Sequence, residues 1–352
     1  MYQQFYNLRD IPFSLAPDPA YLFRTESLLE VFANLQYGIE SGKGLVVVTG
    51  EVGTGKTTVL RSLLQSLDRS VLSAYIFNPL LSTEEFFDLL ASEFRLKPQP
   101  SKAAMLRLLG YVLMSRHTQG MRTVLVIDEA HLLPAHLLEE IRLLSNFETN
   151  REKLLQIILC GQPELHDVLA QPELRQLKQR ISLKCQIKIF TEHETGEYIR
   201  WRLRVAGARD EDLFTPEAIR MAHHYSGGIP RLINNICDNA LLSGFSEESP
   251  RITEAIVGDV IDVLDLAPMT VASPQTVEEI IGEQERRATP GAANINQVST
   301  NQAQINQIPQ TTPRVRYIRP APEPDKSKFT IKTEQEEEGP KFFARVKVLK
   351  SS

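Results

Sequence analysis

The residue types between positions 50 and 58 could hold a polyphosphate. Gly50 is followed by four residues and then by Gly55, Lys56 and Thr57, which is the spacing of a phosphate-binding loop. Glycines let the backbone turn tightly so that its N–H groups face an anion, and the Lys56 ammonium can reach the β and γ phosphates. The Thr57 hydroxyl is the expected Mg²⁺ ligand. The whole loop is therefore expected to contact a nucleotide: Gly50, Glu51, Val52, Gly53, Thr54, Gly55, Lys56, Thr57 and Thr58.

The context of this loop favours a nucleotide site over a chance glycine-rich turn. Apolar β-forming residues precede it at 45–48, and a helix is expected to follow at 59–67. That helix begins near Lys56 and turns the positive end of its dipole toward the same anion. The sequence therefore predicts that the chain binds a nucleoside triphosphate.

An acidic pair, Asp128 and Glu129, closes a second apolar run at 123–127. After a phosphate-binding loop, an aspartate in this position holds Mg²⁺, often through water, and the next glutamate polarises the attacking water. The pair therefore predicts hydrolysis of the triphosphate. The four letters DEAH at 128–131 also mark a helicase class, but no second phosphate-binding core follows before the pattern becomes all helical.

Two amides follow other strands of the expected sheet. Gln162 comes after the fourth strand, where it could sense the γ-phosphate and hold the water, or serve only as a turn amide. Asn78 ends the second strand, where it could hydrogen-bond Glu129 and keep it inactive, or cap the next helix. The sequence leaves both pairs of alternatives open.

Three arginines are further candidates. Arg175 and Arg180 lie just before the last strand, and one of them could reach a neighbouring subunit's γ-phosphate. We favour Arg180, and the alternative is a solvated basic helix face with Lys178 and Lys184 nearby. Arg231 starts a later helix, from which it could fold back on the nucleotide and couple loss of the γ-phosphate to movement of a lid.

Strands and helices alternate in the first part of the chain, which predicts an α/β fold with a parallel sheet covered by helices on both faces. Expected strands are 45–48, 71–77, 123–127, 154–160 and 182–189, and expected helices are 26–41, 59–67, 83–94, 103–117 and one reaching to about 150. The pattern then becomes helical, at 192–206, 216–226, 230–243 and 253–264. We expect a nucleotide-binding domain at 1–190, a small all-helical lid at 191–267 and a disordered tail at 268–352.

Composition limits the function classes. The formal charge is −5 and apolar residues make up 42% of the chain, so a sizeable core is possible and the chain as a whole has no basic footprint for nucleic acid. The three cysteines lack metal-ligand spacing, and two have apolar neighbours, as expected for reduced thiols. The chain shows no secretory signal and no apolar run of the roughly 18 residues that a membrane helix needs. These features predict a cytoplasmic protein.

The two ends of the chain differ from its centre. Residues 1–23 carry several prolines and aromatics, which predicts an irregular lead-in that either covers the adenine or packs against the first helix. Residues 290–313 are almost uncharged and rich in Asn, Gln and Thr, so they cannot bury enough apolar surface to order themselves. Residues 341–350, KFFARVKVLK, alternate apolar and basic side chains, as in a docking strand for a partner's sheet edge or a frayed terminus.

Five motifs follow one another along the chain: GEVGTGKTT, VLVIDEAHLL, LCGQPEL, LKQRI and SGGIPRLINNICDNAL. In type and order they resemble those of the ExeA/GspA-type AAA+ ATPases. These are the general-secretion-pathway A proteins and their soluble relatives in pilus, exopolysaccharide and transposition systems. The lead-in is also similar, so the resemblance covers about residues 1–266. It implies an AAA+ fold, ATP with Mg²⁺, and assembly into a ring or filament. It implies these roles by position: Walker A at 50–58, Walker B at Asp128 and Glu129, sensor 1 at Gln162, the arginine finger at Arg180 and sensor 2 at Arg231.

Secretion-pathway members of the family carry a membrane helix and a peptidoglycan-binding domain after the ATPase, whereas here only the tail follows. The resemblance therefore implies an ATPase that serves envelope assembly, peripheral at the inner membrane through a partner that its tail finds. The alternative is a DNA-dependent ATPase of the transposition-helper type that binds duplex DNA. Its basic stripe would be Lys178, Arg180, Lys184, Arg200, Arg202 and Arg204. A scaffold that binds nucleotide without turnover is disfavoured, because Asp128, Glu129 and Arg180 are all present.

Overall fold

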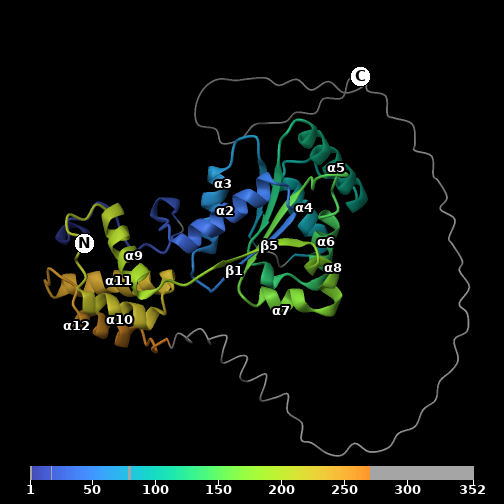
Figure 1. Ribbon diagram of the computed structural model, residues 1–352. Coiled ribbons are helices and arrows are strands. Elements are labelled where there is room, and N and C mark those ends of the chain that lie inside the picture. Colours follow the sequence, from blue (N-terminus) through green and yellow to red (C-terminus); the bar gives the residue numbers. More distant parts are fainter. Residues whose placement is uncertain (1, 17, 78–80, 270–352) are drawn as a thin grey trace, which may run out of the picture. The chain divides into compact units, whose positions relative to one another are not determined.

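The computed structural model describes residues 2–16, 18–77 and 81–269, and Figure 1 shows their arrangement. Five parallel strands form one sheet in the order β2-β3-β4-β1-β5. The three central strands are buried along their whole length, as expected for a parallel sheet covered on both faces. The strands are β1 (Leu45–Gly50), β2 (Leu72–Ile76), β3 (Thr123–Ile127), β4 (Gln156–Gly161) and β5 (Ile181–Ile187).

Helices cover the two faces of the sheet (Figure 1), and alternate residues of the three central strands supply the two cores. Val46 and Val48 of β1 pack with α2 (Glu26–Glu40) and α3 (Lys56–Ser66) on one face. Leu45 and Val47 belong to the core on the other face. The helices of that face are α4 (Thr83–Glu93), α5 (Lys102–Thr118), α6 (Ala135–Leu144), α7 (Leu165–Ala170) and α8 (Arg175–Lys178). The 3₁₀ turn η3 (Pro172–Leu174) lies between α7 and α8.

The expected helix reaching from the acidic pair to about residue 150 was wrong. The chain instead forms a 3₁₀ turn, η2 (Ala130–Leu132), and α6 begins only after Pro134, which has an extended backbone. Proline lacks the N–H that a continuous helix would need, so the two elements stay separate. Helix α6 ends at Leu144, and the chain then makes an isolated antiparallel bridge between Glu148 and Lys153.

Four helices after β5 build a core of their own. They are α9 (Glu192–Val205), α10 (Pro216–Ser226), α11 (Pro230–Ser246) and α12 (Glu254–Val263). Side chains of Thr191 and Thr215 cap α9 and α10, and Gly227 ends α10 in the left-handed conformation. Next to it Gly228 also has a positive φ, and a side chain there would collide with the Phe190 carbonyl. None of the described helices is long and apolar enough to cross a membrane.

The lead-in packs on these helices rather than only against the first long helix. It includes α1 (Tyr2–Phe5) and η1 (Pro19–Tyr21). Tyr6, Leu8 and Phe13 are buried in the core of the helical part, and the Phe13 ring meets Phe214 edge-on at 5.9 Å. Leu22 packs with the cluster beneath α2. The segment therefore contacts both parts of the described chain.

Arg202 anchors the lead-in, so its place in the expected basic DNA-binding stripe was wrong. It is only 6% exposed, and its guanidinium donates to the carbonyls of Pro12 and Ser14 and to the Tyr198 hydroxyl. The same group lies 4.6 Å from the centre of the Tyr21 ring. A guanidinium can satisfy several acceptors at once, which makes it suited to this buried junction.

Replacement of Arg202 by alanine should destabilise the protein. The change would leave two carbonyls of the lead-in without their donors, and we expect a loss of about 3 kcal/mol in the free energy of unfolding. Urea unfolding followed by circular dichroism measures this loss. Arg204→Ala is the matched control, because that side chain is 57% exposed and pairs with Glu211 at 2.5 Å, so its loss should cost much less stability than that of Arg202. Equal losses in the two variants would contradict the anchoring role.

Candidate nucleotide-binding site

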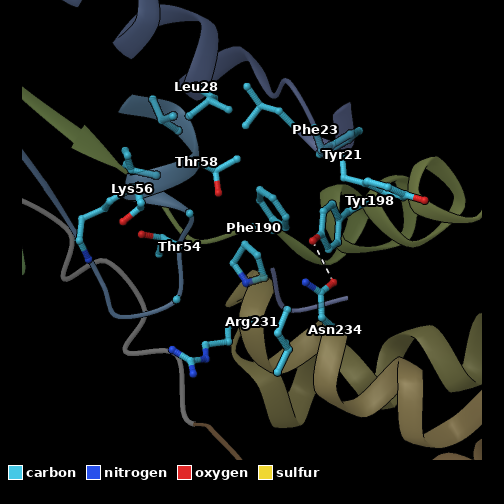
Figure 2. A pocket seen from close by; sticks show the side chains of 18 of the residues that line it. Tyr21, Phe23, Leu28, Thr54, Lys56, Thr58, Phe190, Tyr198, Arg231 and Asn234 are labelled. Atoms are coloured by element: carbon cyan, nitrogen blue, oxygen red, sulfur yellow. Dashed lines mark hydrogen bonds between the residues drawn. The ribbon is translucent and has the colours of Figure 1, made fainter. Parts of the chain in front are cut away.

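A cavity of about 360 Å³ opens above the loop between β1 and α3. That volume lies within the range of about 300–1,000 Å³ typical of ligand pockets. Figure 2 shows Lys56 and Thr58 on one side of it and Tyr198 and Asn234 of the helical part on the other. The cavity is lined by loop residues from Val52 to Thr58, by Glu129 and Gln162, by the lead-in and by α11. The structure thus brings together most of the residues expected to bind the nucleotide.

The loop has the backbone that its glycines were expected to provide. Gly53 and Gly55 have φ of 82° and 88°, in the left-handed region, and Gly55 is the N-cap of α3. Lys56 is 6% exposed, and its ammonium donates to the carbonyls of Gly50 at 2.9 Å and Glu51 at 3.0 Å. The side chains of Glu51 and Val52 are exposed, so these two residues can serve a phosphate only through their backbone.

Gly50 is needed for close approach rather than for an unusual φ. A side chain there would lie 2.9 Å from the Thr54 hydroxyl oxygen and 3.0 Å from the Ile187 carbonyl oxygen. The Thr54 hydroxyl donates to the Glu51 carbonyl at 2.8 Å and closes the loop. Two neighbouring strands, β1 and β5, therefore fix where the loop begins.

Asp128 is buried at the end of β3, where two hydroxyls donate to the same carboxylate oxygen. The Thr57 hydroxyl is 2.7 Å away and the Tyr75 hydroxyl 2.6 Å away. Burial, with the neighbouring Asp128 charge, raises the pKa of Tyr75, so that its hydroxyl remains a donor. Thr57 and Asp128 carry the hard oxygen donors that Mg²⁺ prefers, and their side chains lie in direct contact.

Tyr75 is a residue that the sequence reasoning missed. It lies in β2, where its Cα is the register partner of Val126 in β3. Its contact with Asp128 depends on the register between these two strands, and the motifs in the sequence do not reveal that register. The available signal was a single tyrosine in an otherwise small and aliphatic strand, LSAYI.

Glu129 and Gln162 both line the cavity, as expected for residues that face an attacking water. Glu129 has φ of 52°, an uncommon conformation for a residue with a side chain. Its Oε2 atom is buried and has no hydrogen-bond partner among the described residues. No hydrogen-bond donor among the described residues therefore neutralises this oxygen. Asn78, the other residue proposed to contact Glu129, lies outside the described residues.

Arg231 contacts the phosphate-binding loop directly. Its backbone N–H donates to the Gly53 carbonyl at 3.2 Å, and a side chain on Gly53 would come within 2.7 Å of the Arg231 Cβ. The Arg231 side chain is exposed and lines the cavity. The start of α11 thus meets the loop where a nucleotide's phosphates would lie.

Arg180 lies apart from the cavity. It immediately precedes β5, whose first residue, Ile181, pairs with Leu45 at the beginning of β1, whereas the loop follows the opposite end of β1. Its guanidinium donates to the Ser145 hydroxyl at 3.1 Å. Arg175, the alternative, is exposed at the start of α8. Neither arginine lines the cavity of its own chain.

An aromatic wall faces the loop across the cavity, and the sequence reasoning identified only its lead-in part. Tyr21 and Phe23 come from the lead-in, and Phe190 and Tyr198 from the helical part. The Tyr198 hydroxyl donates to Asn234 at 2.9 Å, as the dashed line in Figure 2 shows. Aromatic rings beside a polar amide are typical of a pocket for a planar heterocycle.

Comparison with known proteins agrees with this geometry. A family model described as an AAA domain matches residues 39–169. General secretion pathway protein A of Aeromonas hydrophila is 45% identical over 264 residues, which are 74% of this chain and 47% of that protein. The chain thus spans about half the length of this curated relative.

Solved structures show the same fold. The ORC2 protein of Aeropyrum pernix, in ADPNP–ADP complexes, has a TM-score of 0.55 and 16% identity, over 74% of this chain and 72% of that one. Cdc6p from Pyrobaculum aerophilum has a TM-score of 0.56 and 15% identity, over 77% and 73% of the two chains. At such low identities these likenesses establish the architecture alone.

Proposed function

Because the chain belongs to the AAA+ ATPases of the general secretion pathway protein A type, we propose that it binds ATP with Mg²⁺ and hydrolyses it to remodel or assemble a partner complex in cell-envelope export. The observation that supports this best is the convergence of Lys56, Thr57, Glu129 and Gln162 on one cavity. The relative's printed name supports the link to secretion. A pilus or polysaccharide system is an equivalent setting for the same motor.

The chemistry of hydrolysis follows from where these groups lie. The Lys56 ammonium would exchange its two loop carbonyls for phosphate oxygens, where its charge is better compensated. Thr57 and Asp128 would hold Mg²⁺, which neutralises charge on the phosphates when bound. Glu129 would accept a proton from the attacking water, because its carboxylate lines the cavity. Gln162, beside it, would orient the same water.

Two arginines would extend the site beyond the loop. Arg231 would follow the γ-phosphate and transmit its loss to the helical part, because its backbone already contacts Gly53. Arg180 cannot serve its own cavity, so we assign it to the nucleotide of a neighbouring copy in a ring or filament. The motor would work in the cytoplasm, where ATP is available. The tail at 268–352, nearly all of it outside the described residues, would find the envelope partner.

Binding of duplex DNA has less support. Arg202 is buried, while Arg200 pairs with Glu197 and Asp212, each at 3.0 Å, and Arg204 pairs with Glu211. Arginines that already pair with carboxylates of the same chain are expected to contribute little affinity for the phosphates of DNA. Lys178 and Lys184 remain exposed members of the expected stripe.

Phosphate release by the purified protein, with and without duplex DNA at low and moderate salt, tests the proposal. We expect turnover that requires Mg²⁺, does not respond to DNA and is abolished in Lys56→Ala. No turnover above that variant would overturn the ATPase assignment. Stimulation by DNA that fades as salt rises would instead favour the DNA-dependent alternative. Recovery of an inner-membrane protein with the ATP-trapped Glu129→Gln form would support the role in export.

A further inference from the structure

His131 lies directly behind the wall of the cavity. It sits in η2, two residues after Glu129, and its side chain is only 10% exposed. Glu129 and Gln162 line the cavity, whereas His131 does not. A nucleotide in the cavity would therefore touch the two neighbours of this histidine but not the histidine itself.

One ring nitrogen of His131 faces both of those neighbours. The backbone N–H of Gln162 donates to Nδ1 at 3.4 Å, and Nδ1 lies 3.5 Å from Oε2 of Glu129. His131 lies close to Gly161, where an added side chain would come within 3.1 Å of the His131 backbone nitrogen and 3.3 Å of Nδ1. The His131 side chain thus contacts both the loop after β4, at Gln162, and the acidic pair, at Glu129.

The Nδ1 atom cannot serve both neighbours in the same way. With its proton on Nε2, the neutral ring accepts from Gln162 and donates nothing to Glu129, whose carboxylate lines the cavity. With a proton on Nδ1, the ring donates toward Glu129 and can no longer accept from Gln162. Oε2 is buried and has no hydrogen-bond partner among the described residues, which matches the first arrangement.

We propose that His131 is a positioning residue for ATP hydrolysis, linking the γ-phosphate-sensing loop at Gln162 to the carboxylate of Glu129. The Gln162 backbone holds the ring as an acceptor, and the ring fixes where Glu129 lies without neutralising it. Movement of Gln162 when the γ-phosphate leaves would release Nδ1 and allow the ring to turn toward Glu129. This proposal rests on the ATPase activity proposed above.

The test compares His131→Phe with His131→Asn. Phenylalanine keeps the ring volume but has no acceptor, whereas asparagine places an oxygen near the position of Nδ1. We expect kcat to fall about 10- to 100-fold in His131→Phe, with the affinity for ADP unchanged, because small misplacement of a reacting group has effects of this order. His131→Asn should recover most of kcat. Added to Glu129→Gln, His131→Phe should cause no further loss, because it acts through that carboxylate.

His136→Asn is the control, because that histidine is exposed on the first turn of α6. Should His131→Phe fail to fold, Gly161→Ala tests the same contact, since its side chain would press on the ring and lower kcat. Wild-type kcat in His131→Phe or in Gly161→Ala would overturn the positioning role. Equal losses of kcat in His131→Phe and His131→Asn would overturn it as well. A wild-type protein that releases no more phosphate than Lys56→Ala would instead overturn the ATPase assignment itself.

Discussion

Glu129→Gln should bind ATP as tightly as the wild type and hydrolyse it about 10²- to 10⁴-fold more slowly, the range expected when a general base is removed. The amide is nearly isosteric with the carboxylate, so the left-handed backbone at this position and the cavity should persist. What is lost is the carboxylate at the cavity that can take a proton from water. Single-turnover phosphate release measures the rate of hydrolysis. Nucleotide retention, measured on the same sample, tests whether ATP binding is unchanged.

Glu30→Gln is the matched control for that variant. Glu30 is an exposed acid on α2 that does not line the cavity, and its replacement makes the same change in net charge. Its turnover should equal that of the wild type. Rapid hydrolysis by Glu129→Gln would show that another group takes the proton, and weakened ATP binding would show that Glu129 acts in the ground state.

The phosphate-binding loop and the acidic pair could be predicted because each is contained in one continuous segment. Gly50 to Thr58 specifies a turn and a helix start by local spacing alone, and the structure gives Gly53 and Gly55 the backbone they were expected to have. Asp128 and Glu129 similarly follow directly from the end of an apolar strand. The parallel sheet covered on both faces was confirmed, and it could be predicted because its three central strands are mainly apolar and buried along their whole length.

The features that were missed depend on distant parts of the chain meeting. The contact of Tyr75 with Asp128 requires the register between β2 and β3. Arg202 looked like one basic residue among several, and only the fold shows that Pro12 and Ser14 bring their carbonyls to it. Long-range contacts of this kind leave no periodic pattern in a single sequence.

Arg180→Ala should lose hydrolysis by about 10³-fold or more while still binding ATP, because an arginine supplied by a neighbouring copy contributes effects of this order. The side chain is held at Ser145 by a 3.1 Å hydrogen bond and lies away from its own cavity, so its loss should not disturb the loop. Arg175→Ala, at an exposed position in the same segment, should change turnover little. The reverse result would transfer the role to Arg175.

Mixing two inactive variants tests whether Arg180 acts between copies. Arg180→Ala keeps an intact loop, and Lys56→Ala keeps an intact Arg180, so an interface that pairs the loop of the first with the arginine of the second is complete. We expect the mixture to regain phosphate release that neither variant shows alone, with a maximum near equal proportions. If every mixture stayed inactive while the variants still assembled together, Arg180 would be acting within its own chain or on folding. The structure makes the first of these difficult, because the arginine and the loop lie at opposite ends of the pairing between β1 and β5.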